Sequence, residues 1–302
     1  MKRILTTTLA VSTLLALPAC SKGGGADAAK LIPDGATAIM GMSPKAVTGS
    51  DLYKTYSEKI PDDGVKKATD ALSGCNLSMD KLDAVVMGMS MDENAAVVVS
   101  GAGVGNPDNA TCLLNKMMEE SGSDKKAEVT EVDGQKVIED EEGRVYLVND
   151  NMMAFATKGW QDQLGALIKG EGKPAIENSL KDIYGKADTK AAIWMAGNIP
   201  AEAADMAKGM AEKASAVKAA AGKIDLSKGL GISVVAVFAD DAGATGAAEE
   251  LNGMLDQYKG MVPADLKAVA DSVKVEASGA DLNLSASASM DDIAAGVKMA
   301  GM

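Results

Sequence analysis

Short apolar stretches that end in turn-forming residues constrain the fold of this chain most strongly. Their length and their flanking residues favour strands over helices. In the first half of the chain these stretches are 36–42 (ATAIMGM), 84–90 (AVVMGMS) and 95–100 (AAVVVS). Asp92-Glu93-Asn94 predicts a hairpin between the second and third stretches. The tight-turn pair Asp133-Gly134 predicts an antiparallel meander over 129–156.

Segments with helical spacing alternate with these strands. Residues 108–120 begin with a capping-type residue and place apolar side chains along one face. The other segments of this kind are 160–169, 247–258 and 290–299. The predicted fold class is therefore α+β, with antiparallel sheets and packed helices.

The second half of the chain repeats the element order of the first half. Residues 191–195 (AAIWM) are followed by Pro200, as 38–42 are followed by Pro44. The further predicted strands of this half are 232–238, 273–275 and 282–286. This order predicts two related, duplicated α+β units, which are 31–170 and 175–302, with a boundary near 170–174 (GEGKP).

One segment of the second half has no counterpart in the first. Residues 202–222 place Met206, Met210 and Val217 at helical spacing, and the apolar stripe is narrow and rich in alanine. The segment predicts a helix that packs on the core. A mobile lid over a ligand site is the alternative.

The amino terminus carries an export signal. Lys2 and Arg3 precede an apolar run over 4–17, which is shorter than the roughly 20 apolar residues that a membrane-spanning helix needs. Pro18 and the glycines at 23–25 interrupt any continuing helix. The segment is therefore predicted to direct export and to be removed afterwards.

Leu17-Pro18-Ala19-Cys20 resembles the lipobox, the cleavage signal of bacterial lipoproteins. The resemblance implies a signal peptide over 1–19, cleavage by signal peptidase II before Cys20, and acyl chains such as palmitate on that cysteine. Several chains on one residue anchor a protein more firmly than a single chain does. Ser21 implies sorting to the outer membrane, and 20–30 are predicted to form a flexible tether. The alternative is an ordinary secretory signal that leaves Cys20 as a free thiol.

Charge and histidine content exclude several classes of function. Removal of 1–19 leaves 28 basic and 43 acidic residues, a formal charge of −15. Such a body repels phosphate backbones, so no nucleic-acid partner is expected, and the acyl anchor must supply the attachment to the membrane. The chain has no histidine, which excludes Ser-His-Asp and Cys-His catalysis and histidine-ligated zinc. No cofactor-binding motif is present, so no cofactor is expected.

Two cysteines remain after Cys20. In an oxidising compartment such as the periplasm, Cys75 and Cys112 most simply form a disulfide. The loop that it closes predicts a stabilisation of up to about 4 kcal/mol. Two buried free thiols or a redox pair are the alternatives, although a redox pair favours C-x-x-C spacing.

Methionine is abundant in a chain that has few aromatic residues: there are 19 methionines. Met87, Met89 and Met91 share one face if their stretch is a strand. Thioether sulfurs are soft ligands, so these residues form a weak candidate site for Cu(I). An apolar ligand surface and ordinary core packing are the alternatives.

Clusters of carboxylates are the remaining candidates for chemistry. They are 139–142 (EDEE), Asp240-Asp241 and Asp291-Asp292, and they lie at a predicted hairpin turn and at predicted helix starts. The sequence therefore predicts a lipid-anchored, non-enzymatic envelope protein that binds or scaffolds an unknown ligand. Two alternatives are a periplasmic carrier of an apolar ligand or lipid, with its cavity between 202–222 and a sheet, and a carboxylate hydrolase that works without histidine.

Overall fold

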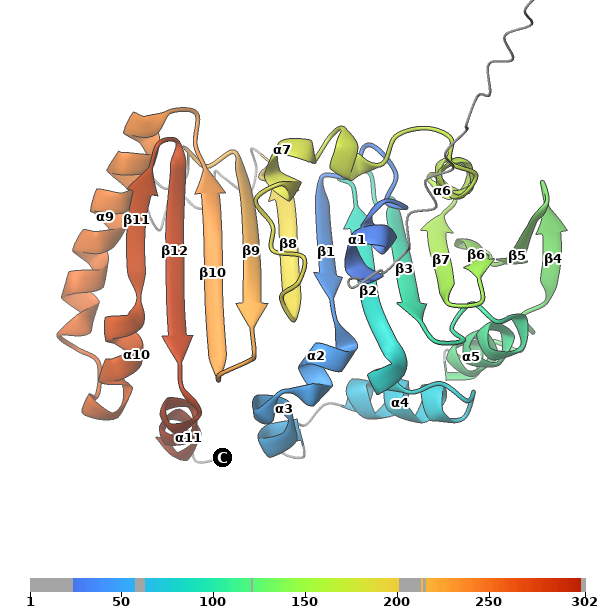
Figure 1. Ribbon diagram of the computed structural model, residues 1–302, viewed down its shortest axis with the longest axis horizontal. Helices are drawn as coiled ribbons and strands as arrows, with labels where there is room; N and C mark the ends of the chain where they lie inside the picture. The colour runs from blue at the N-terminus through green and yellow to red at the C-terminus, as the bar shows by residue number, and fades with distance from the viewer. Residues whose placement is uncertain (1–23, 58–62, 121, 201–212, 214–215, 300–302) are drawn as a thin grey trace, which may run out of the picture.

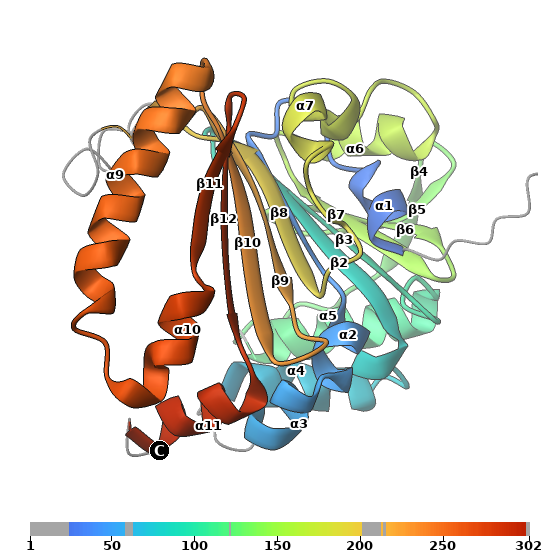
Figure 2. The same ribbon diagram turned by 60° about the vertical axis from the view of Figure 1, so that its left-hand side comes forward.

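The computed structural model of the protein describes residues 24–57, 63–120, 122–200, 213 and 216–299. Within these residues, twelve strands form one sheet in which all neighbouring strands are antiparallel (Figure 1). Helices pack on both faces of this sheet (Figure 2). The predicted α+β fold class is confirmed.

The first half of the chain supplies seven strands to one side of the sheet. They are β1 (Ala38–Met42), β2 (Leu82–Met89), β3 (Ala95–Gly101), β4 (Val129–Val132), β5 (Gln135–Glu139), β6 (Gly143–Asn149) and β7 (Met152–Thr157). The predicted hairpin between β2 and β3 is confirmed. So is the β4–β5 turn, where Asp133 and Gly134 both have positive φ values, 51° and 78°.

The second half supplies the five strands of the other side. They are β8 (Ile193–Asn198), β9 (Ala219–Asp225), β10 (Leu230–Val237), β11 (Lys274–Ser278) and β12 (Asp281–Ala288). The strand order is β11-β12-β10-β9-β8-β1-β2-β3-β7-β6-β5-β4. The two halves of the chain therefore meet at the β1–β8 pair, where the colours change abruptly in Figure 1.

One face of the sheet is covered by α1 (Gly24–Ala29), α6 (Gln161–Ile168) and α7 (Lys181–Tyr184) (Figure 2). The core beneath them contains residues from both halves of the chain, such as Val86 of β2 and Trp194 of β8. Tyr184 of α7 makes an edge-on ring contact with Trp194, with ring centroids 5.6 Å apart. Because this core is common to both halves, each half depends on the other for part of its burial.

The opposite face is covered at its two ends. Helices α4 (Asp63–Ser73) and α5 (Pro107–Glu120) pack over the side made by the first half, while α9 (Asp241–Lys259) and α10 (Lys267–Ser272) pack over β11 and β12. Helices α2 (Pro44–Gly49), α3 (Asp51–Tyr56) and α11 (Met290–Met299) lie at one end of the strands (Figure 1). Helix α11 has the predicted bounds.

The structure corrects two expectations. Residues 24–29 form α1, with Ala28 and Ala29 fully buried, rather than part of a flexible tether over 20–30, because small alanine side chains let this helix pack closely on the sheet. The predicted helix 202–222 is wrong at its end, because 219–225 form β9 between two strands. Residues 201–212, 214 and 215 lie outside the described part of the chain.

Candidate apolar binding site

A cavity of about 740 Å³ lies between the sheet and helices α4 and α5. We call it the α4–α5 cavity. Its volume falls in the range of roughly 300–1,000 Å³ that is usual for pockets that bind small molecules. It lies on the first-half side of the sheet, on the face opposite α1.

The floor of the cavity is made by alternate residues of the sheet. Side chains alternate between the faces of a strand, so the residues that flank the buried Val86 and Val98 point the other way, toward the cavity. The floor residues are Met42 of β1, Val85 of β2, Val97 and Val99 of β3, Ile138 of β5, Val145 of β6, and Met153 and Phe155 of β7. All of them are apolar.

The walls of the cavity come from α4 and α5, each through its apolar side. Helix α4 contributes Ala68, Ala71 and Leu72, and α5 contributes Leu113, Leu114, Met117 and Met118. The predicted disulfide is present in the structure: Cys75, just after α4, is bonded to Cys112 in α5. This bond fixes the two walls to each other at one point.

The rim of the cavity carries the only charged side chains among the described residues that line it. They are Lys67 of α4, Glu120 of α5, and Asp140 and Glu142 of the β5–β6 turn, and all four are exposed. The cavity therefore has an apolar interior and a charged, mainly acidic opening.

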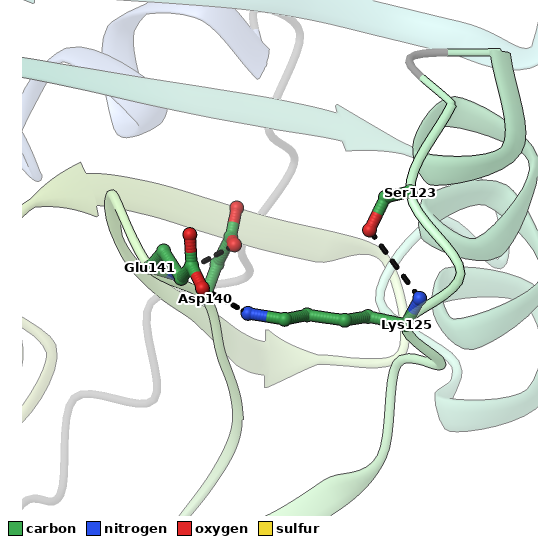
Figure 3. Close-up of polar contacts among 4 residues, drawn as sticks. All are labelled: Ser123, Lys125, Asp140 and Glu141. Carbon is green, nitrogen blue, oxygen red and sulfur yellow. Dashed lines mark hydrogen bonds and ion pairs between the residues drawn. The ribbon is translucent and has the colours of Figure 1, made fainter.

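The β5–β6 turn is held next to the segment that follows α5. Lys125 of that segment forms an ion pair with Glu141 (Figure 3). The Glu141 backbone N–H donates to a carboxylate oxygen of Asp140 at 2.6 Å, and the Lys125 backbone N–H donates to the Ser123 hydroxyl at 3.3 Å. The hydrogen bond from Lys125 lowers the pKa of Glu141 below its ordinary value. These contacts position two of the acidic rim residues.

The methionines of the weak copper hypothesis lie in two different settings. Met87 and Met89 belong to β2, but Met91 lies in the turn beyond its end, so the three do not share one strand face. Among the described residues, no group of three or more histidine, cysteine, aspartate or glutamate side chains could hold a metal ion.

The carboxylate clusters lie in turns and helix caps. Asp240 caps α9 by accepting from the Gly243 backbone N–H at 2.8 Å. Asp292 accepts from the Ser289 hydroxyl and backbone N–H at the start of α11, which lowers the pKa of Asp292. In the 139–142 cluster, Asp140 and Glu142 lie at the cavity rim, whereas Glu141 and Glu139 form ion pairs with Lys125 and Arg144, respectively. The structure does not bring the three clusters together.

A second hollow, of about 550 Å³, lies beside α2 and has a mixed polar and apolar lining. Its charged lining residues are Lys45, Lys190, Lys223, Asp51, Asp188 and Asp225. Lys223 pairs with Asp188 at 2.9 Å, and the positive and negative side chains are equal in number. This hollow therefore favours neither an apolar nor a charged ligand, and the α4–α5 cavity is the better candidate site.

One of the two alternatives drawn from the sequence was a carrier with an apolar cavity, but at a different place. The predicted position was between 202–222 and a sheet, whereas the observed walls are α4 and α5. Helix α4 was not predicted, although Ala68, Ala71 and Leu72 on its cavity side form a helical apolar pattern that could have revealed it. Cys20, the predicted site of lipidation, lies outside the described residues. Within the described part of the chain, no helix combines the length and apolar character needed to cross a bilayer.

Comparison with known proteins gives a fold and no family. No family model and no curated protein matches the chain. Among solved structures, crystal form III of TP0453 is similar with a TM-score of 0.52 and 11% identity, over 89% of this chain and 96% of that one. Crystal form I of the same protein gives a TM-score of 0.47 and 10% identity, over 89% and 95%. At this low sequence identity, the similarity to form III shows a common fold and gives no information on the function of this protein.

Proposed function

We propose that this protein is exported, acylated on Cys20 and held at the bacterial outer membrane, where its body binds an apolar ligand in the α4–α5 cavity without catalysing a reaction. The lipobox at 17–20 supports the anchor. The observation that carries the binding function is a cavity of about 740 Å³ whose interior side chains are all apolar.

The energetics of such a cavity suit a ligand with a hydrocarbon chain. Each methylene that leaves water contributes about 0.8 kcal/mol. A chain of about ten methylenes would therefore gain roughly 8 kcal/mol before the cost of association is subtracted. Methionines such as Met42, Met117 and Met153 line the cavity, and their flexible side chains can adapt to a chain that has no fixed shape.

Two observations support a binding role rather than catalysis. The chain has no histidine, which removes the commonest general base near neutral pH. The three carboxylates that line the cavity, Glu120, Asp140 and Glu142, all lie exposed at its rim rather than inside it, where a general acid or base would be shielded from water.

A cavity-filling substitution tests the binding function. Val97→Trp places a large ring on the floor of the cavity, so the delipidated protein should bind an environment-sensitive apolar dye at least about tenfold more weakly. Val234→Trp is the matched control, because Val234 lies on the same face and in the same cross-strand row but outside the cavity. Circular dichroism would confirm that both variants fold. Equal dye binding by the wild type and both variants would exclude the cavity as the binding site.

A further inference from the structure

The charged side chains at the rim of the α4–α5 cavity restrict the polar end of the ligand. Of the described residues that line the cavity, three carry a carboxylate and one an ammonium group, and all the others are apolar. The described part of the interior therefore offers no hydrogen-bonding side chain to a polar group. A ligand with a hydrocarbon chain inside the cavity must leave its polar end at this rim.

The three carboxylates come from two neighbouring segments. Glu120 is the last residue of α5, while Asp140 and Glu142 flank Glu141 in the β5–β6 turn. The Lys125–Glu141 ion pair holds this turn beside the segment that follows α5 (Figure 3). In the part of the chain that the structure describes, neither these three carboxylates nor Lys67 forms an ion pair. Their charges are therefore available to a ligand.

This charge distribution disfavours an anionic ligand. A fatty acid would bring its carboxylate to a rim whose described lining side chains include three carboxylates and a single ammonium group, that of Lys67, and like charges in close contact are destabilising. A positively charged group at the same place would have three opposite charges around it. The rim thus distinguishes between ligands whose hydrocarbon chains are identical.

We propose that the α4–α5 cavity binds an amphiphile with one hydrocarbon chain in the interior and an ammonium group at the rim, between Glu120, Asp140 and Glu142. This inference rests on the proposed function, since it assumes that the cavity takes up a chain. It adds the chemical class of the polar end, which an apolar cavity alone does not specify.

Three probes with the same chain isolate the contribution of the polar end. Dodecyltrimethylammonium, dodecanol and laurate, each below its micelle concentration, would compete with the apolar dye for the full mature protein. We expect the ammonium probe to bind most tightly of the three. In low salt, laurate should bind about tenfold more weakly than the ammonium probe, because several partly exposed charge pairs together contribute a free energy of this size. The difference should shrink in high salt because exposed charges are screened.

Neutralising the rim tests whether these carboxylates cause the preference. The triple variant Glu120→Gln, Asp140→Asn, Glu142→Gln should bind the ammonium probe and laurate with nearly equal affinity. The control is a triple variant with the same change in net charge at exposed glutamates that do not line the cavity: Glu119→Gln, Glu128→Gln and Glu131→Gln. The control should keep most of the preference.

The outcomes separate this inference from the proposed function. If none of the three probes displaces the dye from the wild-type protein, the cavity does not bind hydrocarbon chains and the proposed function fails. If all three bind, but laurate binds as tightly as the ammonium probe, only the inference about the polar end is overturned. The inference is also overturned if the rim variant prefers the ammonium probe over laurate as strongly as the control variant does.

Discussion

Met40 of β1 and Met195 of β8 lie directly opposite each other where the two halves of the sheet meet. Outward from this pair, the first half continues through β2, β3 and β7, and the second half continues through β9, β10 and β12. Helix α5 follows β3 as α9 follows β10. The first four strands outward from the junction and the helix after the third strand are thus arranged alike on both sides, although the first half has seven strands and the second half five. This arrangement agrees with the expected duplication of 31–170 and 175–302, which stays a prediction because common order alone does not establish common origin.

The junction between the halves depends on a close approach between β1 and the indole of Trp194. A β-carbon added to Gly41 would lie 2.2 Å from an atom of the Trp194 ring, and that ring is almost completely buried. We expect Gly41→Ala to lower the free energy of unfolding by about 1–3 kcal/mol, because the packed ring must move. Urea unfolding followed by tryptophan fluorescence would measure the change.

Gly253→Ala is the matched control for this substitution. Gly253 lies within α9, and an added β-carbon would meet no atom within 4 Å. Since alanine is favoured over glycine inside a helix, this variant should be more stable by up to about 1 kcal/mol. An equal effect of the two substitutions would show that the contact with Trp194 does not matter.

The disulfide between Cys75 and Cys112 should support both stability and ligand binding. Replacing both cysteines by serine should lower the free energy of unfolding by about 2–4 kcal/mol. It should also weaken dye binding, because α4 and α5, the walls of the cavity, would no longer be joined at this point. Chemical denaturation and dye titration would measure the two effects. Free thiols from these positions in the unfolded, unreduced wild-type protein would contradict the bond itself.

The ion pair that holds the β5–β6 turn gives a prediction about pH. The contact with Lys125 lowers the pKa of Glu141 from its ordinary value of 4.5. A lowered carboxyl pKa means that the stabilising contact is present above the ordinary value and is lost as the pH falls through the folded-state pKa. Lys125→Met should therefore raise the pKa of Glu141, as an NMR titration of its carboxyl carbon would show.

Lys126→Met provides the control for this titration. Lys126 is the neighbouring residue, and in the described part of the chain it makes no ion pair with Glu141. Its replacement should leave the pKa of Glu141 nearly unchanged. The effect of Lys125→Met on overall stability should be small, because both partners of the ion pair are mostly exposed. An unchanged Glu141 titration in Lys125→Met would contradict the contact.

Local sequence patterns correctly predicted those helices and strands whose own residues favour the same structure that the folded surroundings impose. The β2–β3 hairpin was predicted because apolar stretches flank a turn, and α11 because its apolar residues repeat at helical spacing. Strand β9 was not, because Ala219–Asp225 begins with alanines, which alone favour a helix. Its pairing with β8 and β10 decides its structure. Long-range hydrogen bonds of this kind leave no local signal.

The candidate site was predictable only in part, for the same reason. The disulfide followed from two cysteines in a chain that the sequence predicts to be exported. The α4–α5 cavity needs a helix near residue 68, another near 114 and six strands that come together only in the folded sheet. Its acidic rim joins Glu120 with Asp140 and Glu142, which the sequence assigned to a helix end and a solvated turn. The β5–β6 turn was predicted correctly, but the local sequence does not show that this turn lies beside a cavity.

Acylation of Cys20 should decide where the protein is found. The resemblance of 17–20 to a lipobox predicts a mature form that begins at Cys20 and carries acyl mass, which intact-mass measurement of detergent-extracted protein would detect. When an ordinary secretory signal replaces 1–19 and Cys20 is changed to alanine, the protein should appear in the soluble periplasmic fraction, because its acidic body has no attraction to anionic lipid. The Cys75→Ser, Cys112→Ser variant with its own leader should stay with the outer membrane, which separates lipidation from folding. A Cys20→Ala protein that still sediments with the outer membrane would show that another part of the chain makes the attachment.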